Sequence, residues 1–345
     1  MSELNLRIEA LSKTGEWLLR NDSPKLELAT LKSQKENPWF TIANINLSIK
    51  SIAEQFLEKS KLEKWLSNYQ MKHARQSKSI GLIMAGNLPL VGFHDFLTVY
   101  LSGHKAQIKL SSKDQFLLPC IVEKLAELDP DIVDQIFFVE KIKSPDAAIA
   151  TGSGNSARYF EYYFRDIPHI IRKNRNSIAV LSGKETDEDL LGLGEDIFQY
   201  FGLGCRSVSA LFVPEGYSFS PMMELFREHW AGISDHVKYR NNYEYNLACS
   251  MLENKKLIVG DHVLLFEEPG FISRIACLHY SHYRNIADVI SIVNQKSEEL
   301  QCVVSSILKA DEVKAQVVGF GKAQQPALMD YADGVDTMDF LLNLK

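Results

Sequence analysis

The chain has 345 residues, 46% of them hydrophobic, which is enough apolar material for one large domain or two medium ones. The formal net charge of −6 argues against a nucleic-acid partner, because affinity for a phosphate backbone requires an excess of lysine and arginine. The five cysteines are odd in number and form no C-x-x-C pair, so neither a disulfide framework nor a zinc site is predicted. Reduced thiols and a cytoplasmic location fit this pattern.

The N-terminal 75 residues are rich in charge and in helix formers, and they predict a helical lead-in. The opening MSELNLRIEALSKTGEWLL has early acidic residues and no apolar run of signal-peptide length, so we expect no secretion signal. Residues 81–101 are the most membrane-like, yet Asn87 and Asp95 there would be costly in hydrocarbon. We therefore expect no membrane insertion and interpret this stretch as a strand, a turn and a helix.

From residue 79, short apolar runs alternate with helical patterns. Strands are predicted over SIGLIMA, KAQIKL, QIFFVE and AAIAT, and helices over VGFHDFLTVYLSG and KDQFLLPCIVEKLAEL. A second alternating set follows the polar stretch 172–176. Such alternation is typical of mostly parallel sheets with helices on both faces. We therefore predict two α/β domains, residues 1–175 and residues 176–345.

The second domain is predicted to contain strands over SIAVLS, VSALFV, HVLLFE, RIACLHY and CVVSSIL, with helices over TDEDLLGLGEDIFQYFG, MMELFREHW and NIADVISIVNQ. The first of these helices opens with Thr186 and Asp189, a variant of the capping box. The C-terminal TMDFLLNL is interpreted as a strand, pairing either across subunits or within its own sheet. The basic stretch RKNR, residues 172–175, is interpreted as a solvated turn between the domains.

Cys205 stands between the helical pattern that starts at Thr186 and the strand VSALFV, just after Gly202 and Gly204. Glycines leave the approach to the thiol open, which suits a catalytic nucleophile. A free cysteine is also among the most commonly buried residues and then acts as a small apolar side chain. From the residues alone, both interpretations remain.

Polar residues follow two predicted strands of the first domain. Asn87 follows SIGLIMA, where its amide could donate to a developing oxyanion or merely shape a turn. At the end of KAQIKL, Lys109 with Ser111 and Ser112 suits a ribose or a phosphate, and an exposed helix cap is the alternative.

Glycine and serine follow a third predicted strand, AAIAT. Gly152 and Ser153 precede a helical pattern, and the N–H groups of a helix N-terminus attract phosphate. The dinucleotide-binding pattern G-x-G-x-x-G is missing. The nine histidines form no H-x-x-H pattern, so no metal site is predicted.

The order of these motifs resembles the aldehyde dehydrogenase superfamily: a strand and Asn-x-Pro, a strand and Lys-x-Ser, a Thr-Gly-Ser turn, then a helix and Gly-x-Gly-Cys. Within it the chain is most similar to the LuxC-type acyl-CoA reductases, over roughly residues 79–271. The resemblance implies an aldehyde-dehydrogenase-like fold with a nucleotide-binding and a catalytic domain. It also implies an acyl-CoA, or another activated acyl group, as substrate, and assembly with further copies of the chain.

By this resemblance, Cys205 would be the acyl-accepting nucleophile, and Asn87 with the Cys205 N–H would form the oxyanion hole. Lys109 would hold the adenosine ribose. The glutamate that reads this ribose in NAD-preferring members would fall at Ser112, so NADPH is expected, with NADH as the alternative. Gly152 and Ser153 would offer backbone N–H groups to the pyrophosphate. Glu268 would contact the nicotinamide ribose, and Glu267 is the alternative to it.

The chain departs from the hydrolytic aldehyde dehydrogenases in one respect. Where these carry a glutamate that activates water, the matching stretch IIRKNRNS has no carboxylate. Exchange of the thioester with a thiol such as coenzyme A is therefore expected rather than hydrolysis. Two alternatives remain: a cysteine thioesterase or acyltransferase without nicotinamide, and a non-catalytic binding subunit of the same fold.

Overall fold

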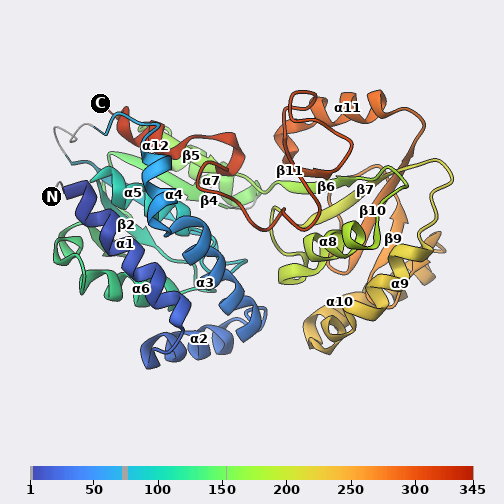
Figure 1. Ribbon diagram of the computed structural model, residues 1–345, viewed down its shortest axis with the longest axis horizontal. Helices are drawn as coiled ribbons and strands as arrows, with labels where there is room; N and C mark the ends of the chain where they lie inside the picture. Colours follow the sequence, from blue (N-terminus) through green and yellow to red (C-terminus); the bar gives the residue numbers. More distant parts are fainter. Residues whose placement is uncertain (1–2, 72–76, 153, 345) are drawn as a thin grey trace. The chain divides into compact units, whose positions relative to one another are not determined.

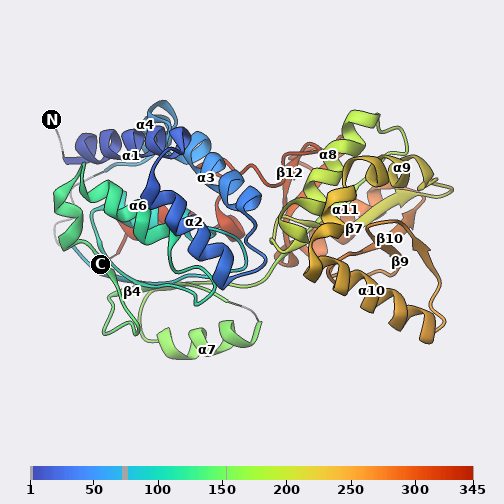
Figure 2. The same ribbon diagram turned by 90° about the horizontal axis from the view of Figure 1, so that it is seen from below.

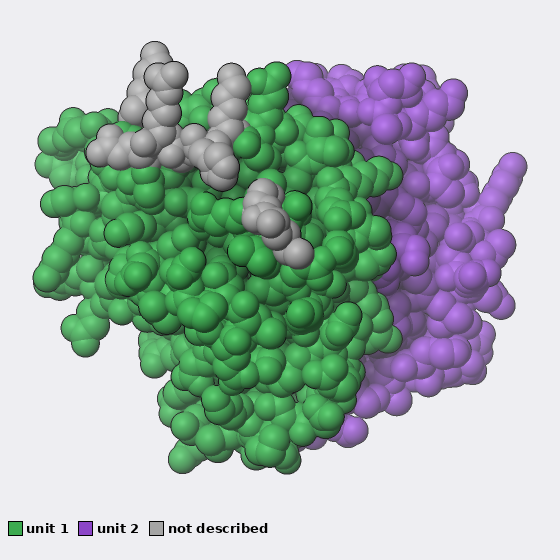
Figure 3. All heavy atoms as spheres, turned by 60° about the vertical axis from the view of Figure 1, so that its left-hand side comes forward, with its two compact units in different colours: residues 1–174, 326–345 green, residues 175–325 purple. Residues whose placement is uncertain are grey.

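The computed structural model describes residues 3–71, 77–152 and 154–344. Its elements form two compact units, residues 1–174 with 326–345 (unit 1) and residues 175–325 (unit 2), coloured separately in Figure 3. Both units combine helices with mostly parallel strands (Figure 1), which confirms the predicted α/β class.

Unit 1 is built around a five-stranded parallel sheet in the order β3-β2-β1-β4-β5. Its strands are β1 (Ser79–Ile83), β2 (Lys105–Lys109), β3 (Ile136–Phe138), β4 (Ala147–Thr151) and β5 (His169–Arg172). Its helices are α1 (Glu3–Arg20), α2 (Pro24–Glu36), α3 (Ile42–Phe56), α4 (Lys59–Leu66), α5 (Phe93–Ser102), α6 (Leu117–Ala126), α7 (Gly154–Phe164) and α12 (Thr337–Leu342). The strand order reverses at β1, which pairs with β2 on one side and β4 on the other. Open α/β sheets bind ligands beyond the carboxyl ends of their strands at such a point.

Different helices cover the two faces of this sheet. Ile80 and Leu82 point to one face, where they join a core formed with α1, α5 and α6. Ala148 and Ala150 of β4 point to the other face and pack against Phe164 of α7. Figure 2 shows α7 on one side of the sheet and α1, α2 and α6 on the other. The alternation follows from the period of two residues in a strand.

The C-terminal residues 326–345 pack within unit 1, whereas the predicted second domain extended to residue 345. Two imidazoles hold this segment: the half-buried His94 has its Nε2 2.9 Å from Leu328 O, and the buried His104 has its Nε2 3.1 Å from Leu341 O. Burial lowers the pKa of both histidines, so each ring is neutral and donates one N–H to a carbonyl. The segment thereby satisfies polar groups that unit 1 would otherwise bury unpaired.

The predicted C-terminal strand is wrong, because TMDFLLNL contains the helix α12. The Asp336 side chain caps this helix by accepting from Asp339 N at 2.9 Å. Met338 and Leu341 are buried three residues apart, which is a helical spacing, and α12 packs on α5. In so short a segment the apolar pattern did not distinguish a helix from a strand.

The prediction of a solvated turn at residues 172–175 is wrong for its first residue. Arg172 ends β5 and is 5% exposed, with Nη2 at 2.7 Å from Asp95 Oδ1. It also donates to Thr337 Oγ1 at 2.8 Å and to Ala332 O at 2.6 Å. A single guanidinium therefore joins β5, α5 and the C-terminal segment.

Unit 2 contains a seven-stranded sheet in the order β12-β11-β6-β7-β10-β9-β8, with only β8 antiparallel to its neighbour among the described strands. Its strands are β6 (Asn176–Val180), β7 (Val208–Pro214), β8 (Leu257–Val259), β9 (Leu264–Glu267), β10 (Cys277–Tyr283), β11 (Leu300–Ser305) and β12 (Gln316–Val318). Its helices are α8 (Asp187–Phe198), α9 (Ser220–His229), α10 (Val237–Leu252) and α11 (Ile286–Gln295). The capping box predicted at Thr186 and Asp189 is confirmed at the start of α8.

We expect Arg172→Met to destabilise unit 1 by about 3 kcal/mol or more, because the substitution leaves Asp95 buried without its counter-charge. Lys173→Met is the matched control, since the ion pair of Lys173 with Glu161 is exposed and such pairs contribute about 1 kcal/mol or less. Urea unfolding followed by tryptophan fluorescence reports on unit 1, where three of the four tryptophans lie. Equal midpoints for the two variants would contradict this role of the ion pair.

Candidate active site

The candidate catalytic and nucleotide-binding residues of unit 1 lie at one edge of its sheet. Ile83, the last residue of β1, is level with Lys109 of β2 and with Ala150 of β4. Because the three strands are parallel, the residues that follow them reach the same edge. These residues are Asn87, Ser111, Ser112 and Gly152. Ser153 lies outside the described residues.

The ends of β1 and β2 approach each other closely. A Cβ on Gly86 would lie 2.5 Å from Ser111 Oγ, so a larger residue there would push the two strand ends apart. Lys109 is exposed at this edge, and its Nζ donates to Glu140 O at 3.2 Å. Ser112 is also exposed. A cation and hydroxyl groups beside a glycine-lined strand end form a donor set that suits a ribose or a phosphate.

The turn between β4 and α7 requires glycine for a similar reason. A Cβ on Gly152 would lie 2.8 Å from the side chains of Ser156 and Phe160. The Gly152 N–H donates to Arg172 O at 3.1 Å, which continues the pairing of β4 with β5. The helix α7 starts two residues later, so its N-terminus lies beyond the carboxyl end of β4. An anion bound at this edge would meet backbone N–H groups.

Asn87 is exposed in the turn that connects β1 to α5. The turn contains Leu90 with φ +58°, which is unusual for a residue with a side chain. The Leu90 N–H donates to Asp114 Oδ2 at 2.7 Å. Burial raises the pKa of Asp114 to about 6, although the hydrogen bond from Leu90 opposes the shift. Sequence analysis missed Asp114, and its only signal was its place just beyond β2.

The proposed nucleophile lies in a short turn of unit 2. Cys205 is half-buried between Gly204 and Arg206, three residues before β7. Ser207 N donates to Gly204 O at 3.0 Å, and Ser177 Oγ on β6 donates to Cys205 O at 3.0 Å. The backbone of the cysteine is thus fixed by the turn itself and by the neighbouring strand.

The helix before this turn ends earlier than predicted. The pattern suggested a helix to Gly202, but α8 ends at Phe198. Tyr200 and Phe201 then adopt φ values of +53° and +61°, in the left-handed region. Such a conformation costs about 1–3 kcal/mol per non-glycine residue and is typical of functional sites. It places the Phe201 ring 4.2 Å from the His236 ring, measured between centroids.

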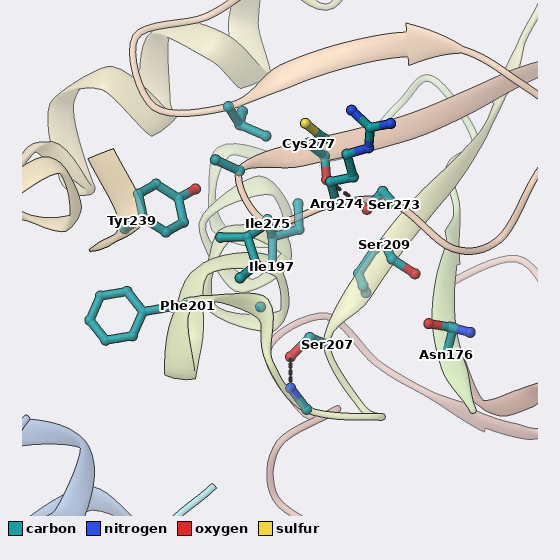
Figure 4. Close-up of a pocket in the computed structure, with 15 residues that line it drawn as sticks. Asn176, Ile197, Phe201, Ser207, Ser209, Tyr239, Ser273, Arg274, Ile275 and Cys277 are labelled. Carbon is teal, nitrogen blue, oxygen red and sulfur yellow. Dashed lines mark hydrogen bonds between the residues drawn. The ribbon is translucent and has the colours of Figure 1, made fainter. Parts of the chain in front are cut away.

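A cavity lies beside the cysteine turn (Figure 4). It is small, with a volume of about 60 Å³, and lies at the amino ends of β6, β7 and β10. Gly204 and Ser207 of the turn line it. Its other walls are formed by apolar and polar side chains of unit 2, among them Ile197, Phe201, Tyr239, Ser209, Ser273 and Arg274. Two residues of the turn thus border the cavity, whereas Cys205 itself is not among the residues that line it.

Other thiols near this turn are poor nucleophiles. Burial raises the pKa of Cys277, which lines the cavity, to about 12. Burial also raises the pKa of Cys302 to about 11, although the nearby charge of Arg206 and the Ser177 hydroxyl oppose the shift. Both thiols stay protonated at neutral pH, whereas the thiolate is the reactive form. Arg206 is itself buried and donates to Ala323 O at 3.3 Å and Gln316 Oε1 at 3.1 Å.

Glu268 follows β9, and its carboxylate is half-exposed. One oxygen lies 3.5 Å from Lys255 Nζ and the other 3.5 Å from His279 Nε2. Its rival Glu267 ends β9 and is exposed. Among the described residues, no group of three or more histidine, cysteine or acidic side chains could hold a metal ion. In the part of the chain that is described, no helix is long and apolar enough to cross a membrane.

The sequence matches one protein family over most of its length. The family model described as acyl-CoA reductase (LuxC) matches residues 27–318, which is most of the chain. The chain belongs to the LuxC acyl-CoA reductase family. The resemblance drawn from the motifs is thereby confirmed, and the protein is an enzyme of the acyl-CoA reductase type. No curated protein matches this LuxC family member in sequence.

Solved structures confirm the aldehyde-dehydrogenase-like fold of this LuxC family member. Aldehyde dehydrogenase 21 from Physcomitrella patens, in complex with the reaction product succinate, superposes with a TM-score of 0.70 at 11% identity, over 99% of this chain and 84% of that chain. An oxidoreductase from Marinobacter aquaeolei superposes with a TM-score of 0.68 at 12% identity, over 94% of this chain and 79% of that chain. A mutant of aldehyde dehydrogenase C from Pseudomonas syringae, complexed with NAD⁺ and octanal, superposes with a TM-score of 0.65 at 12% identity. The match covers 92% of this chain and 76% of that chain.

In the native protein, we expect iodoacetamide to modify Cys205 faster than Cys120, Cys277 or Cys302. The last three are buried and their thiol pKa values are raised, so little thiolate is available to the reagent. Peptide mass spectrometry after short exposures at pH 7.5 measures the four rates. The half-buried Cys249 of α10 serves as an internal reference for exposure. Modification of Cys302 as fast as that of Cys205 would contradict the burial argument.

Proposed function

We propose that the protein reduces an acyl-CoA, with a fatty acyl chain, to the aldehyde by way of a thioester on Cys205, using NADPH. The observation that carries this proposal is the half-buried Cys205 in a turn with a fixed backbone. Membership of the LuxC family supports the acyl-CoA substrate. The other buried thiols near the turn are disfavoured as nucleophiles by their raised pKa values.

The first chemical step needs a nucleophile and a place for negative charge. The Cys205 thiolate attacks the carbonyl carbon of the acyl thioester, and the coenzyme A thiolate leaves when the tetrahedral intermediate collapses. The Asn87 side-chain amide and the Cys205 backbone N–H donate to the oxyanion of this intermediate. Donors fixed in advance stabilise such charge without reorganising during the reaction. The hydrogen bond from Ser177 to Cys205 O keeps the peptide of the nucleophile in place.

The carboxyl edge of the unit 1 sheet supplies groups that fit a nicotinamide dinucleotide. Lys109 and Ser111 would hold the adenosine ribose, and the turn at Gly152 would meet the pyrophosphate. Glu268, which belongs to unit 2, would contact the nicotinamide ribose. The two glycine contacts fit this assignment, because side chains at Gly86 and Gly152 would fill the strand ends. Two structural neighbours, from Pseudomonas syringae and Bacillus cereus, were solved with NAD⁺. When bound, NADPH supplies the hydride that reduces the Cys205 thioester.

The fate of the thioester depends on which nucleophiles can reach it. The stretch IIRKNRNS carries no carboxylate that could activate water, and Arg172 within it is committed to Asp95. We therefore propose that hydrolysis is slow and that coenzyme A is the exchange partner. After reduction, Cys205 leaves as the thiolate and the aldehyde is released.

Cys205→Ser should abolish NADPH oxidation with acyl-CoA, because the hydroxyl is a far weaker nucleophile than a thiolate. Asn87→Ala should lower kcat by about 10²–10³, the effect of losing one oxyanion donor. Absorbance of the reduced nicotinamide, with acyl-CoAs from short to long chain, measures both effects and the chain-length preference. Cys249→Ser is the matched control and should keep full activity. Turnover retained in Cys205→Ser would refute the mechanism, and consumption of acyl-CoA without nucleotide would favour a thioesterase.

Ser112→Glu should shift the preference from NADPH towards NADH. A carboxylate at this position would accept from the ribose hydroxyls of NADH and repel the 2′-phosphate of NADPH. The ratio of kcat/KM for the two nucleotides measures the shift, and Ser112→Gln, which adds the same bulk without charge, is the control. An unchanged ratio would show that Ser112 does not face the ribose.

A further inference from the structure

The turn that carries Asn87 is held by groups outside the proposed reaction. Its Leu90 has φ +58° and is 5% exposed, so the left-handed backbone lies in the core rather than in solvent. Residues with side chains keep such a conformation only when their surroundings fix it. Contacts to Leu90 therefore hold the turn 87–92 in place.

Asp114 is the group best placed to hold the turn 87–92. Its Oδ2 accepts from Leu90 N at 2.7 Å, a short hydrogen bond of the kind that charged acceptors form. Asp114 comes from the loop after β2, so the bond ties the end of one strand to the turn after its neighbour. On the other side, Ser48 Oγ of α3 donates to Pro89 O at 2.7 Å. The peptide that joins Pro89 to Leu90 is thus held at both its oxygen and its nitrogen.

The position of Asp114 is otherwise unfavourable for a carboxylate. The residue is 9% exposed, it lines a small cavity with Met84, Leu90 and Phe93, and its Oδ1 has no partner among the described residues. A buried carboxylate with one unpaired oxygen lowers the stability of a fold. The one contact that offsets this cost is the hydrogen bond from Leu90 N, so the aspartate is tied to the conformation of the turn.

We propose that Asp114 is a positioning residue, whose bond to Leu90 N fixes the turn that presents Asn87 to the reacting carbonyl. The inference rests on the proposed oxyanion role of Asn87. The oxyanion donor must lie within a few tenths of an ångström of its place, and a displacement of about 1 Å can cost 10²-fold in rate. Asp114 acts through the backbone and does not itself touch substrate.

A double-mutant cycle tests this coupling. Asp114→Ala should lower kcat by about 10–100-fold while the KM for NADPH changes less than about twofold. In the Asn87→Ala background the same substitution should change kcat by less than about twofold, because the donor that it misplaces is already gone. Asp114→Asn should restore most of the rate, since its carbonyl can still accept from Leu90. Gln115→Ala, exposed on the same loop, is the control and should have no effect.

The outcomes separate this inference from the proposed function. A normal kcat for Asn87→Ala would refute the oxyanion role and this inference with it. A slow Asn87→Ala with a normal Asp114→Ala would refute only the role of Asp114. Equal losses from Asp114→Ala in both backgrounds would show a general structural effect. Hydrogen exchange of the Leu90 amide gives a test without turnover: exchange should be slow in the wild type and in Asp114→Asn, and fast in Asp114→Ala. Slow exchange in Asp114→Ala would also overturn the inference.

Discussion

In each unit, a buried carboxylate that accepts main-chain N–H groups supports the segment that carries a proposed reactive group. Asp114 does so in unit 1 through Leu90. In unit 2, Asp196 of α8 is 1% exposed and accepts from Gly321 N at 2.8 Å and Ala323 N at 2.9 Å. Burial raises the pKa of Asp196 to about 7, and the two N–H donors oppose the shift. Amide donors therefore offset part of the cost of burying these two carboxylates.

The loop held by Asp196 connects it to the cysteine turn. Ala323 O accepts from the buried Arg206, and Gln324 Nε2 donates to Ser207 Oγ at 3.1 Å. The loop can approach α8 closely because two glycines meet there: a Cβ on Gly192 would lie 2.9 Å from Gly321 N. Ala323 and Gln324, more than a hundred positions after Cys205, thus hold the residues that follow the nucleophile by hydrogen bonds. In this way the turn is supported by both β6 and the C-terminal part of the unit.

Sequence reasoning succeeded where the local pattern and the tertiary structure agree. The alternation of strands and helices and the capping box at Thr186 both follow from short-range patterns, and the first two strands of unit 1 lie within two residues of their predicted ends. Sequence reasoning failed where a residue distant in the sequence determines the local structure. Arg172 looked like part of a solvated basic turn until the structure placed Asp95 against it, and the last helix, α12, was mistaken for a strand before its packing on α5 was known.

By itself the sequence determined the α/β class and the family, because both depend on periodicity and on the order of motifs along the chain. Which residues support the reactive groups was decided only by the tertiary structure. The bonds from Leu90 to Asp114 and from Gln324 to Ser207 join residues 24 and 117 positions apart. The left-handed backbone at Tyr200 and Phe201 likewise has no sequence signal, since residues with side chains adopt it only when packing over-determines their conformation. Local propensity reaches only a few residues, whereas these contacts arise when parallel strands bring their ends to one edge.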